Sequence, residues 1–254
     1  MRAALAVSDT PLAREAEQAL RRAYRFVPVA EAEVIVALGG DGFLLALLHR
    51  LLDKGLHVPV FGMNRGTVGF LMNDWSAERL PERLAAARGF ALRPLTMVAT
   101  TQAGATQVSP AFNEVSLLRE TRQVARIEIA IDGKVRMAEL AADGVLVATP
   151  AGSTAYNLSV NGPILPLESD LLALTAISPF RPRRWHGALI PNRSVVEFRI
   201  LEAERRPVSA VADQVEVRDV THVRVSTDFD RALELRFDPE YALDDRIFAE
   251  QFMT

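Results

Sequence analysis

The segment Gly39-Gly40-Asp41-Gly42 joins an apolar, strand-like run to a segment of helical character. Glycines allow a tight turn and let backbone N–H groups come close to a phosphate, and the start of a helix offers further N–H groups to an anion. An aspartate there would repel phosphate unless it has another task, such as accepting the proton of an attacking hydroxyl in phosphoryl transfer. We interpret Asp41 as a general base, while the loop alone also allows Asp41 simply to cap the helix.

Two further loops carry residue types that suit a ligand. Residues 64–71 read NRGTVGFL, and residues 143–159 read as a strand that ends in a loop of small and hydroxylated residues. Small residues allow close backbone approach, hydroxyls donate and accept hydrogen bonds, and Tyr156 offers a ring for stacking. The loop at 39–42 is followed by no Gly-Lys-Ser/Thr, so it is not a Walker loop, and it lacks the GxGxxG spacing of the dinucleotide fingerprint.

The elements that must position these loops differ between the two parts of the chain. In residues 1–95, strand and helix signals alternate: Thr10-Pro11 predicts a helix start, and Val34 to Leu38 is apolar throughout, as in a strand covered on both faces. This alternation predicts a parallel sheet with helices on both sides. We therefore assign residues 1–95 to an α/β, Rossmann-like domain.

From residue 96 to 239, short segments rich in valine and isoleucine predict a mostly antiparallel β-sandwich domain. Asp132-Gly133, between Arg126–Ile131 and Lys134–Leu140, predicts a hairpin with a primed turn. In residues 240–254, apolar side chains recur at helical spacing, which predicts a last helix that returns to the first domain. The further expected strands are Val195–Leu201, Val208–Ala212, Val215–Val217, Val223–Thr227 and Ala232–Phe237.

Composition narrows the class of protein. The chain has 254 residues, no cysteine and a formal net charge of −3. The absence of cysteine excludes disulfides and thiol chemistry. The slightly negative net charge argues against a nucleic-acid partner, because nucleic-acid-binding proteins normally carry a basic surface. The apolar runs are too short for a signal peptide or a membrane span. We expect a cytoplasmic protein that binds neither nucleic acid nor membrane.

Together these segments resemble bacterial NAD kinases, the ATP/polyphosphate–NAD kinase family. That family is marked by a GGDG loop, an N-x-G-x-x-G-F-L segment, an Asn-Glu pair and a D-G…T-P-x-G-S-T-A-Y stretch. Here they are residues 39–42, residues 64–71, Asn113-Glu114 and residues 143–156, in the same order. The GGDG loop alone is shared with phosphofructokinases and diacylglycerol-type lipid kinases and does not separate them.

The resemblance implies phosphorylation of the 2′-hydroxyl of the adenosine ribose of NAD to give NADP. ATP or polyphosphate would be the donor, with Mg²⁺ or another divalent cation on its phosphates and no metal site built by the protein alone. Asp41 would accept the proton, with Gly42 beside it, and Phe70 would lie against the adenine. Asn113 and Glu114 would hold ribose hydroxyls.

In the β domain, the resemblance implies that Asp143 meets polar groups of the nicotinamide half and that Tyr156 packs on a ring. Gln214, which follows Asp213, would also reach the site from this domain. A homodimer or homotetramer is also implied. The rest of the dinucleotide site would be lined by Ala151, Thr154, Ala155, Asn157, Leu158 and Ser159.

Two alternatives stay open at this point. A diacylglycerol-type lipid kinase should show an apolar or basic surface facing a membrane. A non-catalytic nucleotide-binding sensor on the same scaffold should lack Asp41 or Glu114, and both are present. Asn161 departs from the family pattern, because it stands where a glycine is common, and we expect the loop that contains it to differ in shape.

Overall fold

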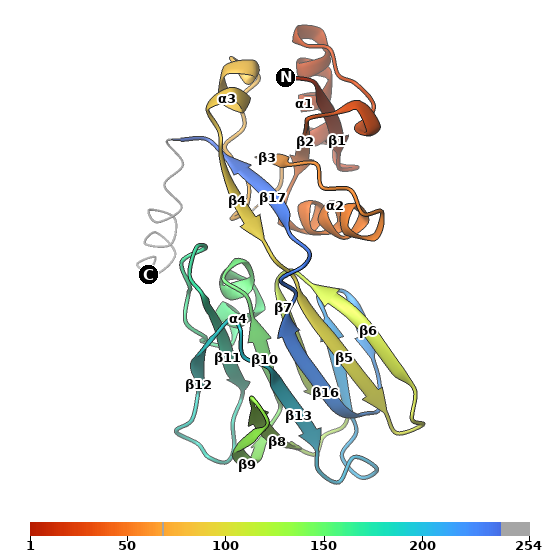
Figure 1. The fold of residues 1–254 in the computed structure, drawn as a ribbon, viewed down its shortest axis with the longest axis vertical. Coiled ribbons are helices and arrows are strands. Elements are labelled where there is room, and N and C mark those ends of the chain that lie inside the picture. The colour runs from red at the N-terminus through yellow and green to blue at the C-terminus, as the bar shows by residue number, and fades with distance from the viewer. Residues whose placement is uncertain (68, 240–254) are drawn as a thin grey trace. The chain divides into compact units, whose positions relative to one another are not determined.

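The computed structural model describes residues 1–67 and 69–239, and the chain forms two compact units (Figure 1). The first unit comprises Met1–Leu92 together with the chain from Arg231, and the second comprises Arg93–Asp230. The predicted last helix, at 240–254, lies outside the described residues.

The first unit is a five-stranded sheet in the order β1-β2-β3-β17-β4. β1, β2, β3 and β17 run parallel, and β4 is antiparallel to β17. This confirms the predicted α/β class with a parallel sheet. The strands are β1 (Ala3–Val7), β2 (Val34–Gly39), β3 (Val60–Asn64), β4 (Arg88–Leu92) and β17 (Leu233–Phe237), and the helices are α1 (Pro11–Ala23), η1 (Val29–Glu31), α2 (Asp41–Asp53) and α3 (Leu80–Ala86).

Local sequence signals explain these elements. The Thr10 hydroxyl accepts a bond from the N–H of Ala13 at 3.3 Å and caps α1, as predicted. All six residues of β2 are buried, as a strand with helices on its sheet must be. Leu20 of α1 and Leu84 of α3 pack in one core with Phe61 of β3.

One strand belongs to a different unit from the one expected. The range 96–239 placed the strand ending at Phe237 in the β domain. In the structure, β17 pairs with β3 and β4 of the first unit, with Leu235 opposite Val60 and Leu233 opposite Leu92. The sequence of an apolar strand does not show which sheet it will join, because its pairing partners are set by long-range packing.

The second unit consists of two six-stranded antiparallel sheets, which confirms the predicted sandwich class. Asp132 and Gly133 have φ of 52° and 72°, as the predicted primed turn between β8 and β9 requires. One sheet is β12-β11-β10-β7-β14-β15: Gly187–Pro191, Leu171–Ile177, Gly144–Ala148, Glu114–Arg119, Val208–Ala212 and Val215–Val217. The other is β6-β5-β16-β13-β8-β9: Thr106–Ala111, Leu95–Thr101, Val220–Thr227, Val196–Ile200, Ala125–Ile131 and Lys134–Ala142.

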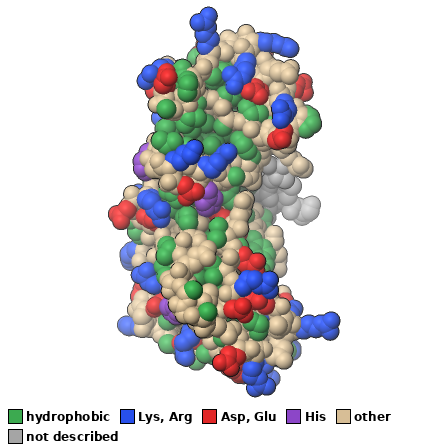
Figure 2. All heavy atoms as spheres, turned by 90° about the vertical axis from the view of Figure 1, so that its right-hand side faces the viewer, with side chains coloured by type: hydrophobic (Ala, Val, Ile, Leu, Met, Phe, Trp, Pro, Cys, Tyr) green, Lys and Arg blue, Asp and Glu red, His purple; other side chains and the backbone are tan. Residues whose placement is uncertain are grey.

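Apolar residues of both sheets form the core of this unit, with Phe198 of β13 and Val147 of β10 completely buried. After β10 the chain makes two short helical segments, η2 (Ala151–Thr154) and α4 (Tyr156–Ser159). On the face of the molecule in Figure 2, Lys and Arg side chains are interspersed with Asp and Glu side chains, as the small net charge would suggest.

Candidate functional site

In the first unit, the predicted catalytic aspartate fixes a neighbouring loop. Gly40 precedes α2 and provides no side-chain cap, and Asp41 is the first helical residue. The Oδ2 atom of Asp41 accepts the N–H of Phe70 at 2.8 Å, and Oδ1 accepts the N–H of Leu71 at 3.0 Å. The alternative that Asp41 only caps its helix is therefore wrong, because its carboxylate is bonded to a loop about thirty residues later in the chain.

The GGDG loop and the loop after β3 pack backbone against backbone. The N–H of Arg65 donates to the carbonyl of Gly39 at 2.7 Å. A Cβ on Gly66 would lie 3.0 Å from the Cα of Gly40, which is tighter than ordinary contact, and the N–H of Gly66 is held by Asn64 Oδ1 at 2.8 Å. A side chain at position 66 would therefore press against the backbone of Gly40 where the two loops approach each other.

The far end of this second loop is anchored by Asn73, whose side chain is fully buried. Its amide nitrogen donates to the carbonyls of Gly62 and Arg236, and its amide oxygen accepts the N–H of Asp238 at 2.8 Å. The loop that binds the Asp41 carboxylate is therefore tied to β3 and to β17.

In the second unit, another carboxylate organises the predicted Asn-Glu pair. Asp213 Oδ2 accepts the N–H of Phe112 at 2.7 Å, and Oδ1 accepts the N–H groups of Asn113 at 2.9 Å and Glu114 at 3.3 Å. Asp213 and Gln214 form the connection between β14 and β15, in which Ala212 pairs with Val215. Gln214 itself is exposed there.

Glu114 lies in an environment that disfavours its charge. Its Oε2 atom is buried and has no hydrogen-bond partner within the described part of the chain. Burial, and then the charge of Asp213, raise the pKa of Glu114 from 4.5 to about 7. The pKa of Tyr156 is also raised, by burial and then by the charges of Glu114 and Asp143. The structure therefore places the predicted site residues Glu114, Tyr156 and Asp143 near one another.

The loop after β10 is bonded directly to the Asn-Glu pair. The N–H of Thr149 donates to the carbonyl of Asn113 at 2.9 Å. The Thr149 hydroxyl donates to the carbonyl of Phe112 at 2.6 Å and accepts the N–H of Gly152 at 3.0 Å. A Cβ on Gly152 would lie 2.1 Å from the carbonyl oxygen of Asn113, so only glycine allows this approach.

The amide of Asn157 holds the same loop in shape. It is completely buried, donates to the carbonyls of Ser153 and Pro163, and accepts the Thr175 hydroxyl at 2.6 Å. Asn161 has a φ of 62°. Because asparagine tolerates this left-handed conformation, it can take the backbone shape that a glycine would.

The remaining predicted site residues vary in exposure. Asp143 forms an ion pair with Arg119 of β7. Tyr156 packs beside a small apolar cluster that includes Leu146 and Ala148. Gly42 and Ser159 are exposed, Ala151 is buried, and Phe70, Thr154, Ala155 and Leu158 are half-buried.

Sequence reasoning did not assign a role to Asp213, Thr149 or Asn73. One signal for Asp213 was its place beside Gln214 between two predicted strands, where an acidic side chain often bonds to backbone N–H groups. Asn73 is the second residue after the N-x-G-x-x-G-F-L segment. An internal asparagine carries no comparable signal, because its partners lie far away in the sequence.

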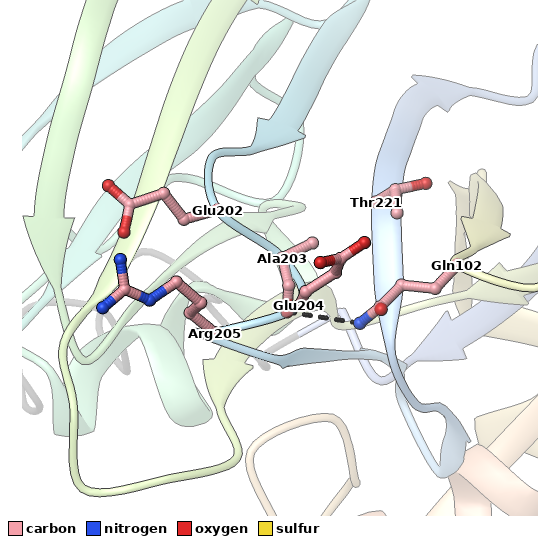
Figure 3. Close-up of a pocket in the computed structure, with 6 residues that line it drawn as sticks. All are labelled: Gln102, Glu202, Ala203, Glu204, Arg205 and Thr221. Atoms are coloured by element: carbon pink, nitrogen blue, oxygen red, sulfur yellow. Dashed lines mark hydrogen bonds between the residues drawn. The ribbon is translucent and has the colours of Figure 1, made fainter.

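A cavity of about 450 Å³ in the second unit lies apart from these residues. It is lined by Gln102, Glu202, Ala203, Glu204, Arg205 and Thr221 (Figure 3). The Gln102 amide donates to the carbonyl of Ala203 at 3.2 Å across it. None of the predicted site residues lines this cavity.

Comparisons with known proteins agree with the motifs. The family model for the ATP-NAD kinase C-terminal domain matches residues 103–228. NAD kinases of Rhizorhabdus wittichii and Zymomonas mobilis are 60% and 55% identical to the chain over 251 residues; the matches cover 99% of this chain and 98% and 97% of those proteins.

Two solved structures share the fold. Yeast NADH kinase complexed with NADH has a TM-score of 0.78 at 20% identity, covering 98% of this chain and 87% of that one. An NAD kinase from Archaeoglobus fulgidus in complex with ATP has a TM-score of 0.72 at 24% identity, covering 98% of both chains. Fold and relatives define an enzyme of the kinase class. The chain belongs to the NAD kinase family. Within its described residues, none of the helices is long and apolar enough to cross a membrane.

Proposed function

We propose that this enzyme transfers a phosphoryl group from ATP, or from another polyphosphate, to the 2′-hydroxyl of the adenosine ribose of NAD, giving NADP. The observation that carries the proposal is the Asp41 carboxylate, which the N–H groups of Phe70 and Leu71 hold in one orientation at the start of α2. A general base must meet the proton it accepts at hydrogen-bond distance, and a carboxylate that is held in one orientation supports that role.

The start of α2 supports a place for the donor phosphates beside Asp41. Its first-turn N–H groups and the helix dipole favour an anion, and a Cβ on Gly42 would have no atom within 4 Å, so the backbone there is accessible. No cluster of three His, Asp or Glu side chains in the described ranges could hold a metal. We propose, by family resemblance, that Mg²⁺ or another divalent cation enters bound to the donor phosphates.

Asn113 and Glu114 are proposed to hold the ribose hydroxyls. A buried carboxylate oxygen without a partner is costly, and Glu114 Oε2 is such an atom in the described structure. A ribose O–H would supply the missing donor. Phe70 lies against the adenine in this proposal, and Asp143 and Tyr156 meet the nicotinamide half. Gln214, Ala151, Thr154, Ala155, Asn157, Leu158 and Ser159 complete the dinucleotide site.

The first experiment is an assay of purified protein with NAD, ATP and Mg²⁺, in which NADP formation is followed. NADH, inorganic polyphosphate and diacylglycerol are tested as alternative substrates in parallel. Phosphorylation of the lipid with NAD untouched would overturn the proposal. By family resemblance, we further propose that the enzyme acts in the cytoplasm and forms a homodimer or homotetramer. Sedimentation of the same preparation measures the oligomeric state.

The second experiment is Asp41→Asn. Loss of the base is expected to lower kcat by about two to four orders of magnitude. The amide also has one NH₂ group where the carboxylate had an acceptor, so one of the bonds to Phe70 and Leu71 is lost as well. The matched control is Asp53→Asn at the exposed other end of α2, which should leave kcat unchanged. Near-normal turnover of Asp41→Asn would exclude Asp41 as the general base.

A further inference from the structure

Asp213 bonds to three consecutive backbone N–H groups, those of Phe112, Asn113 and Glu114. In addition, the backbone N–H of Asp213 donates to the carbonyl of Glu114 at 3.2 Å. The partners are about a hundred residues apart in the chain. A single carboxylate therefore connects the β14–β15 turn to the start of β7.

The position of this carboxylate in the sheet explains its geometry. β14 pairs with β7, and the last pair in the ladder is Ala212 opposite Val115. Asp213 follows directly, where the strand turns away and the N–H groups before Val115 lose their regular sheet partners. Bonds from N–H groups to an ionised carboxylate are shorter and stronger than neutral ones. The Asp213 side chain thus continues the ladder past the end of the strand.

We infer that Asp213 is a positioning residue that sets the orientation of the Asn113 and Glu114 side chains. The inference rests on the proposed function, in which those two side chains hold the ribose of NAD. Asp213 acts through them: its bonds fix the backbone from which both side chains project. None of the four family motifs includes Asp213.

Asp213 also affects the charge of the pair. After burial, its charge is the second cause of the raised pKa of Glu114, and the hydroxyl of Tyr156 from α4 is the other titratable group coupled to Glu114. Asp143 is coupled to Tyr156 in turn and is paired with Arg119. Removing the charge at position 213 should therefore lower the pKa of Glu114.

The first test needs no catalysis. The carboxyl carbon of Glu114 is titrated by NMR in ¹³C-glutamate-labelled protein, and its signal is assigned by its loss in Glu114→Gln. In Asp213→Asn, the Glu114 midpoint should move to lower pH than in the parent. An unchanged midpoint overturns the inference that Asp213 controls this group, whether or not the protein proves to be an NAD kinase.

The second test is kinetic. Asp213→Asn should raise KM for NAD about tenfold or more with a smaller change in kcat, and the Glu114 limb of the pH profile of kcat/KM should move in the direction seen by NMR. Asp219→Asn is the matched control, because Asp219 also has a positive φ in a short connection, at 54° against 50° for Asp213. Equal KM values in both variants would overturn the inference.

A third variant separates charge from geometry. Asp213→Glu keeps the charge but moves the oxygens by one methylene, so Glu114 should still titrate near neutral pH while KM for NAD rises. This variant also serves if Asp213→Asn does not fold. If Asp213→Glu has the parent KM, the three N–H contacts do not position the pair, and the inference fails. If the parent forms no NADP, the proposed function fails and the NMR result alone decides.

Discussion

Gly152→Ala is the sharpest steric test of the second-unit cluster. The added Cβ would lie 2.1 Å from the oxygen, 2.4 Å from the carbonyl carbon and 2.5 Å from the Cα of Asn113. These are backbone atoms, so no side-chain rotation can relieve the clash. Overpacking of this kind costs about 1–3 kcal/mol, and displacing Asn113 also weakens its 2.9 Å bond from the N–H of Thr149, worth about 1 kcal/mol.

We therefore expect Gly152→Ala to lose about 2–4 kcal/mol of the free energy of unfolding, measured by urea denaturation. KM for NAD should rise as well, because Asn113 and Glu114 move. Gly133→Ala is the control. A Cβ there meets nothing within 4 Å, but the φ of Gly133 is 72°, so about 1–2 kcal/mol of left-handed strain is expected, with KM for NAD unchanged. Equal stability loss in the two variants would show that Asn113 does not press against Gly152.

Two further predictions concern the same cluster. Thr149→Val should cost about 2 kcal/mol in urea denaturation, because the buried carbonyl of Phe112 and the N–H of Gly152 both lose the hydroxyl; a change under about 0.5 kcal/mol contradicts this. The pKa of Glu114 is about 7 in the folded state, against 4.5 for an ordinary glutamate. Between pH 4.5 and pH 7, Glu114 therefore keeps a proton in the folded state that it has lost in the unfolded state. Its protonation thus favours folding at low pH, and stability falls as pH rises through this window. The stability of the parent relative to Glu114→Gln should drop by on the order of 2–3 kcal/mol from pH 5 to pH 8, and a flat difference would contradict the raised pKa.

The elements that local signals define could be predicted from the sequence. The Asp132-Gly133 turn demands positive φ, and no long-range information is needed to place it. The same holds for the Thr10 cap and for β2, whose apolar run can only be buried. These features depend on a few neighbouring residues, so their physics is contained in a short window of sequence.

What could not be predicted depends on partners far apart in the chain. β17 joins the first sheet because the edge of β3 is available for pairing. The sequence of the strand itself does not show which sheet it will join. Asp41 could be proposed as a base, but its bonds to Phe70 and Leu71 follow only from the loop packing. The Asp213 contacts cross about a hundred residues, and a carboxylate in a turn gives no indication of which N–H groups it will meet.

The place of β17 in the first sheet also determines the order in which the nascent chain can fold. β4 ends at Leu92, β17 begins at Leu233 opposite it, and the whole of Arg93–Asp230 is synthesised in between. At ribosomal speeds this interval lasts on the order of ten seconds. During that time the edge of β3 that will receive β17 has no strand to pair with, and such an open edge favours association with other chains. The first unit can therefore complete its sheet only after the second unit has been synthesised, and we expect the newly made chain to be most prone to aggregation during that interval.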